Sequence, residues 1–365
     1  MFDLSQRARV HLLPIGGSGI GPLASILARM GHSVSGCDLV ESPRLERLRA
    51  LGIDVQVGHD PAHLASAEVV VASRAIPPGE PELAAARARG LPVLSRASAL
   101  AAVCTLRRTL AVGGTHGKTT TTAMLATVLV EAGMAPSYLV GGDVAGLASS
   151  AAWDEGEWFV VEADESDGTF LELGAEGVLV TGVEPDHLDH HGSVDALREA
   201  FARFLAGAPG PRVVCLDDPV AAALASELDC LTYGTGEGAR FRVVDVELAP
   251  RTTSFRLCEG GAELGRFEVP APGLHNARNA AGAAVAALAL GATLEATKRG
   301  LARFGGVARR FEWRGEAGGV SFVDSYDHLP GEVSAALAAA RAGGWDRIVC
   351  VFQPHRYTRT AALWR

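Results

Sequence analysis

Short apolar runs alternate with amphipathic stretches along most of the chain. The first apolar run, at 9–15, precedes a glycine cluster, a helical stretch over 22–30 and a second strand that ends at Asp38. A strand, a glycine-rich turn, a helix and a further strand make up a βαβ unit. The run at 67–73 predicts a strand buried on both faces of a parallel sheet. The N-terminal third therefore predicts an α/β domain.

A second unit of the same kind begins with an apolar strand at 109–114. A helix over 119–132 follows and ends at Gly133, because glycine adopts the left-handed conformation that closes helices. The remaining expected elements are strands at 157–164, 177–183 and 212–217, a helix over 194–206, an antiparallel patch over 240–270, and a helix over 276–290.

A third segment starts near Phe311. Its pattern predicts strands at 320–324 and 347–352 with a helix over 331–342 between them. Since domains usually have about 100–150 residues, we expect this third domain to be incomplete. A partial α/β domain exposes a sheet edge and apolar surface, which predicts limited stability. The expected domains are 1–107, 108–306 and 307–365.

Composition narrows the class of protein. The chain has 365 residues, 48% hydrophobic and 21% charged, as in ordinary globular proteins. A net charge of −9 without a basic run argues against nucleic-acid binding. No apolar stretch approaches the roughly 20 residues of a membrane span, and the N-terminus lacks signal-peptide features, so we expect a cytoplasmic protein. The six cysteines form no CxxC pair, which argues against a thiolate metal site. We expect most of them to be small buried apolar residues.

The sharpest chemical signal is the glycine-rich segment Gly113–Thr120, which joins the strand at 109–114 to the following helix. Glycines let backbone N–H groups approach phosphate oxygens, and a helix N-terminus favours an anion. Lys118 would reach the β- and γ-phosphates, and Thr119 would coordinate Mg²⁺. Val112 stands where the full P-loop pattern has its first glycine. The alternative is a tight strand–helix turn that carries a surface lysine.

Two acidic clusters follow the next two buried strands, at 162–167 and 184–191. Ligands of parallel α/β sheets bind at the carboxyl ends of the strands, so both clusters should lie near the P-loop. Their carboxylate and imidazole groups suit a Mg²⁺ ion that bridges phosphates. The alternative is a solvated acidic loop, and a zinc site at His187, His190 and His191 is disfavoured because adjacent histidines point apart.

These segments, taken together, resemble the Mur ligases of peptidoglycan synthesis. The resemblance covers essentially the whole chain in family order, and its motifs are IGGSG from 15, GTHGKTTT from 114, EADESDGTF from 162, EPDHLD from 184, GLHNARNA from 273, ARRF from 308 and FQPHRYTR from 352. It implies an α/β protein of three domains: a Rossmann-like N-terminal domain for a UDP-sugar, a central P-loop domain for ATP, and a truncated Rossmann-like C-terminal domain for the amino acid.

The resemblance also implies which residues bind ATP and Mg²⁺. Thr119, Glu162 and His187 would hold Mg²⁺, and Arg310 would lie on the γ-phosphate. Asn279 would be the main polar contact on the adenine and ribose side. The full ATP set is Gly114, Thr115, His116, Gly117, Lys118, Thr119, Thr120, His275, Asn276, Asn279 and Arg310.

The implied reaction joins L-alanine to UDP-N-acetylmuramate through an acyl phosphate. The catalytic set would be Lys118, Glu162, His187, Arg310 and His328, with His328 as the candidate base for the amine. The implied substrate contacts are Gly17, Ser18 and Gly19 at the UDP diphosphate, Ser73 and Arg96 at the nucleotide-sugar, and Asp324, Tyr326, His355 and Arg356 at the acceptor side.

The chain departs from the family pattern near the expected acceptor site. Gly182 replaces an asparagine, and the segment 324–330 reads DSYDHLP where the family has DDYAHHP. The amino-acid preference therefore stays open, and with an incomplete third domain we expect little ligase activity. Three other functions remain as alternatives: a UDP-MurNAc peptide ligase of cell-wall recycling, a non-catalytic nucleotide or UDP-sugar binder, and a P-loop small-molecule kinase.

Overall fold

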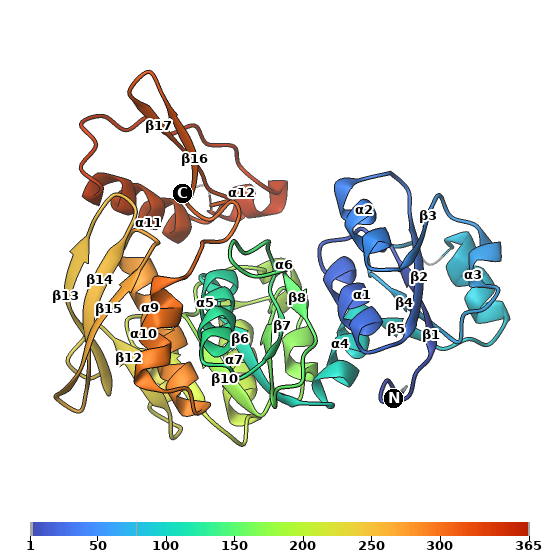
Figure 1. Cartoon of the computed structure of the whole chain (residues 1–365), viewed down its shortest axis with the longest axis horizontal. Coiled ribbons are helices and arrows are strands. Elements are labelled where there is room, and N and C mark those ends of the chain that lie inside the picture. The colour runs from blue at the N-terminus through green and yellow to red at the C-terminus, as the bar shows by residue number, and fades with distance from the viewer. Residues whose placement is uncertain (1–2, 78, 364–365) are drawn as a thin grey trace.

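The computed structural model describes residues 3–77 and 79–363, which form three units along the chain (Figure 1). The N-terminal unit is a five-stranded parallel sheet in the order β3-β2-β1-β4-β5. Its elements are β1 (Arg9–Leu13), α1 (Ile20–Arg29), β2 (Ser33–Asp38), α2 (Pro43–Ala50), β3 (Asp54–Val57), η1 (Pro61–Leu64), β4 (Val69–Ala72), α3 (Pro81–Ala88), β5 (Val93–Ser95) and α4 (Arg96–Cys104).

The apolar runs of the N-terminal unit form the interior strands β1 and β4 of this sheet. All four residues of β4 are buried, as expected for a strand covered by helices on both faces. β1 lies between β2 and β4, so the glycine turn that follows it emerges at the carboxyl ends of neighbouring strands. The predicted βαβ unit and the buried strand at 67–73 are confirmed.

The central unit is a ten-stranded sheet in the order β15-β14-β13-β12-β11-β10-β6-β9-β7-β8. Its elements are β6 (Arg108–Gly113), α5 (Lys118–Glu131), β7 (Ser137–Leu139), β8 (Ala151–Ala152), β9 (Trp158–Glu162), η2 (Thr169–Glu172), β10 (Gly177–Val180), α6 (Leu188–His191), α7 (Val194–Ala206), β11 (Arg212–Cys215), α8 (Pro219–Ala225), β12 (Leu231–Gly234), β13 (Phe241–Leu248), β14 (Thr253–Glu259), β15 (Ala262–Val269), α9 (Leu274–Ala289) and α10 (Leu294–Ala302).

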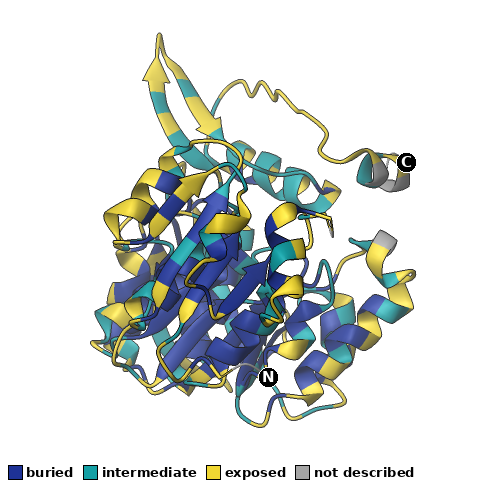
Figure 2. Ribbon diagram, turned by 90° about the vertical axis from the view of Figure 1, so that its right-hand side faces the viewer, coloured by how far each residue is buried: buried dark blue, intermediate teal, exposed yellow. Residues whose placement is uncertain are grey.

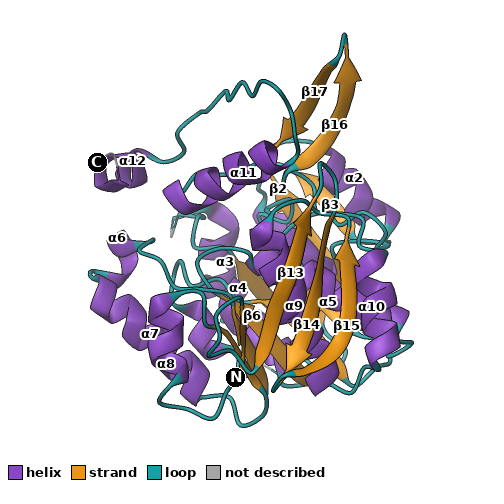
Figure 3. Ribbon diagram, turned by 90° about the vertical axis from the view of Figure 1, so that its left-hand side faces the viewer, coloured by secondary structure: helices purple, strands orange, loops and turns teal. Residues whose placement is uncertain are grey.

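Strand direction changes at both edges of this sheet. The interior strands β7, β9, β6, β10, β11, β12 and β13 run parallel, and β8 pairs antiparallel with β7 at one edge. At the other edge β13, β14 and β15 pair antiparallel, as Figure 3 shows. The antiparallel patch predicted over 240–270 and the helix predicted over 194–206 are both confirmed.

Alternating side chains of β6 build two cores. Leu110 and Val112 pack with α5 and α9 on one face, and Ala111 belongs to a second cluster with Phe201 and Phe204 of α7 on the other. That second cluster continues into the N-terminal unit, so the two units share buried apolar packing. In Figure 2 the strands at the centre of the molecule are accordingly almost entirely buried.

The C-terminal segment lies over the central unit, and its structure differs in part from the prediction. It contains β16 (Glu312–Ala317), β17 (Val320–Asp324), α11 (Pro330–Ala342) and α12 (Tyr357–Leu363). The predicted strand at 320–324 and helix at 331–342 are confirmed. The strand predicted at 347–352 is wrong: this stretch is irregular, and Val351 is 95% exposed. β17 pairs instead with β16 in an antiparallel ribbon that projects outward (Figure 2).

Among the described residues, no helix combines the length and the apolar character that crossing a membrane requires.

Candidate active site

The phosphate loop connects β6 to α5 at the centre of the large sheet. Gly114 and Gly117 have φ angles of 129° and 77°, which side chains rarely adopt. A Cβ at Gly114 would overlap the Thr181 hydroxyl, and one at Gly117 would lie 2.5 Å from Asn279 Oδ1. The loop therefore needs glycine at both positions, and His116, Gly117 and Thr120 of the loop line the neighbouring cleft.

Lys118 is held by the first acidic cluster. Its Nζ lies 2.7 Å from Glu165 Oε2 and donates to the Gly114 carbonyl at 2.7 Å. The exposed fractions of the Lys118 and Glu165 side chains are 13% and 1%. Burial opposes the charge of Lys118, but the carboxylates of Glu165 and Asp164 outweigh it and raise the pKa of the ammonium group. A fixed positive charge thus lies at the phosphate loop.

Thr119 and Glu162 form the oxygen-rich part of the site. Thr119 Oγ1 donates to Glu162 Oε1 at 2.9 Å, and the Gly141 N–H donates to Glu162 Oε2 at 2.8 Å. Burial raises the pKa of Glu162, and nearby Lys118 opposes the rise. A hydroxyl and a carboxylate in contact are the hard oxygen donors that Mg²⁺ prefers.

The predicted ligand His187 lies in a different pairing. His187 Nε2 is 3.1 Å from Asp186 Oδ2, and Asp186 is also within 3.3 Å of Arg359 from α12. Among the described side chains, His187 forms no ion pair with Glu162. His191 Nε2 bonds to the Glu165 carbonyl oxygen at 2.9 Å, and the clusters of metal-ligand type in the described part of the chain do not include the disfavoured zinc triad.

A cleft of about 1270 Å³ opens beside the phosphate loop. The predicted ATP residues that line it are His116, Gly117, Thr120, His275, Asn276, Asn279 and Arg310. Asn276 Nδ2 donates to the Pro272 carbonyl at 2.8 Å, and Asn279 Nδ2 donates to Asn276 Oδ1 at 3.3 Å. Burial, aided by nearby Arg278, lowers the pKa of His275 to about 4, so this imidazole is neutral at pH 7. His275, Asn276 and Asn279 therefore present neutral polar groups to the cleft.

Thr115 ties the loop to the second acidic cluster. Its hydroxyl donates to the Glu184 carbonyl at 3.0 Å and accepts from the Glu184 N–H at 2.9 Å. This double contact fixes the loop against the segment after β10.

Glu332 of α11 links the C-terminal segment to the phosphate loop, and sequence analysis did not single it out. Its carboxylate lies 3.4 Å from His116 Nδ1 and 3.5 Å from Arg310. His116 Nε2 is 3.1 Å from Glu184, in an ion pair rather than a well-directed hydrogen bond. Burial disfavours the charged imidazole, but the carboxylates of Glu184 and Glu332 outweigh it and raise the pKa of His116 to about 9.

Three predicted acceptor-side rings meet above the cleft. The ring centroids of Tyr326 and His328 are 5.0 Å apart, and His355 lies 5.6 Å from Tyr326 and 5.9 Å from His328. Asp324 lies 3.8 Å from Arg309, whose guanidinium group lies over the Tyr326 ring. Arg356 is exposed, with a φ of 68°.

The predicted nucleotide-sugar residues meet at the carboxyl edge of the N-terminal sheet. Gly19 caps α1, and a Cβ there would lie 2.8 Å from Arg96 Cδ, so the arginine lies across the glycine turn. Ser18 is exposed in that turn, and Gly17 N–H donates to the Pro14 carbonyl at 3.1 Å. Ser73 N–H donates to the Leu13 carbonyl at 2.9 Å, directly beside the turn.

The N-terminal turn also faces the acidic cluster of the central unit. Burial alone would raise the pKa of Asp164, but the charge of Lys118, the hydrogen bonds with Ser166 and, least of these, the charge of Arg96 together lower it. Arg74 Nη1 lies 3.6 Å from Asp167 Oδ2. The two predicted nucleotide sites are therefore neighbours across the interface between the units.

Three family models match consecutive parts of the chain. "Mur ligase family, catalytic domain" matches residues 9–108, "Mur ligase middle domain" matches 112–287, and "Mur ligase, glutamate ligase domain" matches 309–364. The chain belongs to the Mur ligase family.

Individual ligases are similar to this chain over nearly its whole length. The UDP-N-acetylmuramate–L-alanine ligase of Rhizobium etli is 45% identical over 97% of this chain and 78% of its own length. The enzyme of the same name from Acidothermus cellulolyticus is 46% identical over 99% of this chain and 77% of its own. Among solved structures, UDP-N-acetylmuramate-alanine ligase MurC from Thermotoga maritima superposes with a TM-score of 0.86 at 28% identity, covering 98% of this chain and 83% of that one.

A second solved structure carries a different name. It is the UDP-N-acetylmuramate:L-alanyl-gamma-D-glutamyl-meso-diaminopimelate ligase of Neisseria meningitides, with a TM-score of 0.74 and 30% identity. The alignment covers 83% of this chain and all of that one, 100%. Alanine-adding and peptide-adding ligases thus share this architecture.

Proposed function

We propose that this protein joins L-alanine to UDP-N-acetylmuramate at the expense of ATP, a step of peptidoglycan precursor synthesis. The observation that carries the proposal is the phosphate loop, where Lys118 pairs with buried Glu165, Thr119 contacts Glu162, and the neighbouring Gly117 and Thr120 line the cleft. The names of the relatives at 45% and 46% identity support the choice of substrates.

ATP would lie with its phosphates on Gly114–Thr120 and its base toward His275, Asn276 and Asn279. The close contact between Gly117 and Asn279 supports this arrangement, because it brings the two ends of the proposed site together. Lys118 and Arg310 would face the transferred phosphoryl group, whose dense negative charge requires cations held in place in advance.

The residues present fit a Mg²⁺ ion. Thr119 and Glu162 offer oxygen donors already in contact, and we assign His187 as a third candidate ligand. When bound, Mg²⁺ would neutralise charge on the phosphates.

The reaction would proceed in two steps. The muramoyl carboxylate attacks the γ-phosphate, which gives an acyl phosphate and ADP. The alanine amine then attacks the acyl carbon, and phosphate leaves. The amine must first lose a proton, and His328 is the candidate acceptor.

The surroundings of His328 support this role. Burial lowers the pKa of His328, so its imidazole is neutral at pH 7. His328 Nδ1 lies 3.0 Å from the Tyr326 carbonyl, which can only accept, so Nδ1 carries the proton and Nε2 is left free to accept one.

The substrates would be divided among three domains, 1–107 for the UDP-sugar, 108–306 for ATP and 307–365 for the amino acid. Gly17, Ser18 and Gly19 would bind the UDP diphosphate, with Ser73 and Arg96 beside them. Asp324, Tyr326, His355 and Arg356 would face the acceptor. We also propose a cytoplasmic location, where ATP and UDP-sugars are available, and the six free cysteines agree with a reducing compartment.

A second candidate function is the ligation of a preformed peptide to the same UDP-sugar. The 30% identity to the Neisseria ligase favours it, together with the altered acceptor segment at 324–330. Competition between L-alanine and the tripeptide, in an assay of ADP release, separates the two functions.

Calorimetric binding of UDP-N-acetylmuramate, with UDP-N-acetylglucosamine as the control ligand, is the first test. We expect selective binding that weakens in Arg96→Ala, and low ADP release that depends on L-alanine. Binding without any ADP release would favour a non-catalytic role. A folded sample that binds neither nucleotide-sugar would contradict the proposal.

A further inference from the structure

A cluster of six metal-ligand side chains is enclosed in the N-terminal unit, away from the cleft. Its members come from β1, β2, the segment 59–63, and the N-cap and first turn of α3, and they are His11, Cys37, His59, Glu80 and Glu82, with His63 bonded to Glu82. His11, Cys37 and Glu82 are completely buried, with exposed fractions of 0%. Such groups are rarely enclosed together unless they are paired or bind a metal.

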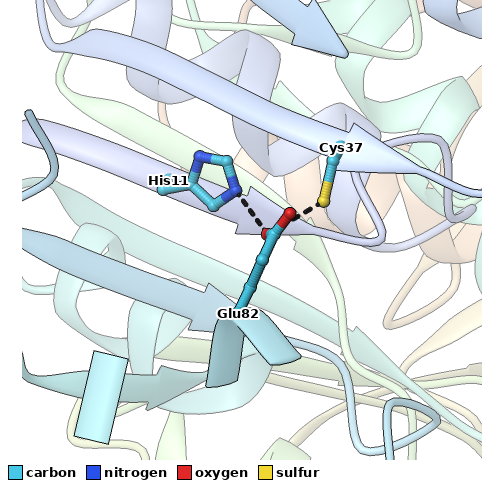
Figure 4. Close-up of side chains that lie close together, drawn as sticks. All are labelled: His11, Cys37 and Glu82. Atoms are coloured by element: carbon cyan, nitrogen blue, oxygen red, sulfur yellow. Dashed lines mark hydrogen bonds and ion pairs between the residues drawn. The ribbon is translucent and has the colours of Figure 1, made fainter. Parts of the chain in front are cut away.

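Two of the ligand atoms meet at the Glu82 carboxylate, whose Oε2 lies 3.0 Å from His11 Nε2 and 3.1 Å from Cys37 Sγ. Figure 4 draws these three side chains and their contacts. His59 Nδ1 lies 3.0 Å from the same sulfur. Ligand atoms on a four-coordinate zinc ion are separated by roughly 3.3–3.8 Å, given bond lengths of about 2.0–2.3 Å. The three observed separations are slightly shorter than this range, as expected for hydrogen-bonded atoms, and the ligand atoms of His11, Cys37 and Glu82 all lie within 4.8 Å of one another. His59 belongs to a second such group, with Glu80 and Glu82.

The neighbouring contacts orient these atoms in the way that metal sites require. His11 Nδ1 is hydrogen-bonded to Ser35 Oγ at 2.9 Å, which turns Nε2 toward Glu82. Glu82 Oε1 accepts from His63 and from the Asp60 N–H, each at 2.8 Å, which leaves Oε2 for the centre of the cluster. His11 and Glu82 thus each have an outer partner.

We propose that His11, Cys37, His59 and Glu82 form a binding site for a zinc-like divalent transition metal. A thiolate and a carboxylate would balance the two positive charges of the ion, and the two imidazoles would bind as neutral ligands. The ion would tie β1 and β2 to α3. It would enter past His59 and His63, whose side chains are 11% and 21% exposed.

Metal binding at this site exchanges a proton for the ion. In the metal-free protein the Cys37 thiol donates a hydrogen bond to the Glu82 carboxylate at 3.1 Å. Because a metal binds the thiolate, the ion would displace the Cys37 proton to solvent.

The test uses the whole chain, stripped with a chelator and titrated with Zn²⁺ or Co²⁺. We expect one Zn²⁺ per chain, release of about one proton at pH 7, and a thiolate-to-cobalt charge-transfer band with Co²⁺. Cys37→Ser should abolish the band and weaken Zn²⁺ affinity at least about tenfold, whereas Cys104→Ala, another buried cysteine of this unit, should leave both unchanged. Because the band requires a thiolate ligand, it also distinguishes this site from metal bound at the phosphate loop, where no thiol is proposed as a ligand.

Two controls show that lost affinity does not come from misfolding: a comparison of folding, and a variant with a milder change. Circular dichroism of the metal-free proteins should be identical, because serine preserves a donor to Glu82. His59→Gln, at the partly exposed rim, should weaken the affinity while it keeps the band. A folded wild-type chain that binds no Zn²⁺, or Zn²⁺ affinity unchanged in Cys37→Ser, would overturn the proposal and leave a purely hydrogen-bonded cluster.

Discussion

Replacing Lys118 by methionine should damage stability and catalysis for separate reasons. At an effective dielectric constant of about 20, charges separated by the observed 2.7 Å attract each other by roughly 6 kcal/mol. Desolvation of both groups offsets most of this attraction, so the intact pair contributes little net stability. Lys118→Met, however, leaves the Glu165 carboxylate buried and unpaired, which should cost about 3–5 kcal/mol.

A double-variant cycle separates the two effects. Lys118→Met/Glu165→Gln removes the unpaired charge, so denaturant unfolding should recover most of the lost free energy. ADP release should stay at least about 100-fold below wild type in both variants, because each lacks the cation at the phosphates. A double variant as unstable as the single one would refute the electrostatic argument. ADP release close to wild type in Lys118→Met would refute the assignment of the phosphate site.

Three further predictions concern other parts of the molecule. His116 has a pKa raised to about 9, so its ion pairs stabilise the fold fully below about pH 6.5 and are lost as pH rises through 9. Unfolding free energy should therefore fall by up to about 3 kcal/mol between pH 7 and pH 10, and His116→Asn should lack this fall. Gly36→Ala should cost about 1–3 kcal/mol in urea unfolding, because its Cβ would overlap the Leu12 carbonyl and lie 2.6 Å from the Ile15 side chain, whereas Gly236→Ala, in open space, should be neutral. Arg96→Ala should weaken calorimetric binding of UDP-N-acetylmuramate at least about tenfold and leave ATP binding unchanged; equal losses for both ligands would contradict separate sites.

Local signals made most of the fold predictable. The apolar runs at 67–73 and 109–114 identify strands because each is central in its sheet, and the glycines after the second run identify the phosphate loop. Because ligands of parallel sheets bind at the carboxyl ends of the strands, the segments after β9 and β10 were predicted to lie beside that loop. The contacts of Lys118 and Thr115 confirm this position.

The strands of the C-terminal segment were predicted only in part, because strand composition there does not match strand pairing. The apolar run at 347–352 has the composition of a buried strand, yet a strand forms only beside a partner, and none pairs with it among the described residues. β16 is largely polar, so its composition did not identify it. The signal that could have found it is Gly318–Gly319, whose positive φ angles of 58° and 74° form the tight turn between β16 and β17.

Contacts between distant segments limit what a motif can reveal. Lys118 and Glu165 were both visible in motifs, but only the fold shows that they pair, and Glu332 joins the site from a helix that carries no phosphate motif. The N-terminal cluster is the extreme case, since its ligands come from four separate segments and Cys37 lacks a second cysteine nearby. The absence of a CxxC pair therefore argued only against one class of metal site. Spatial convergence on Glu82 defines another class, which a parallel sheet can assemble without any short motif.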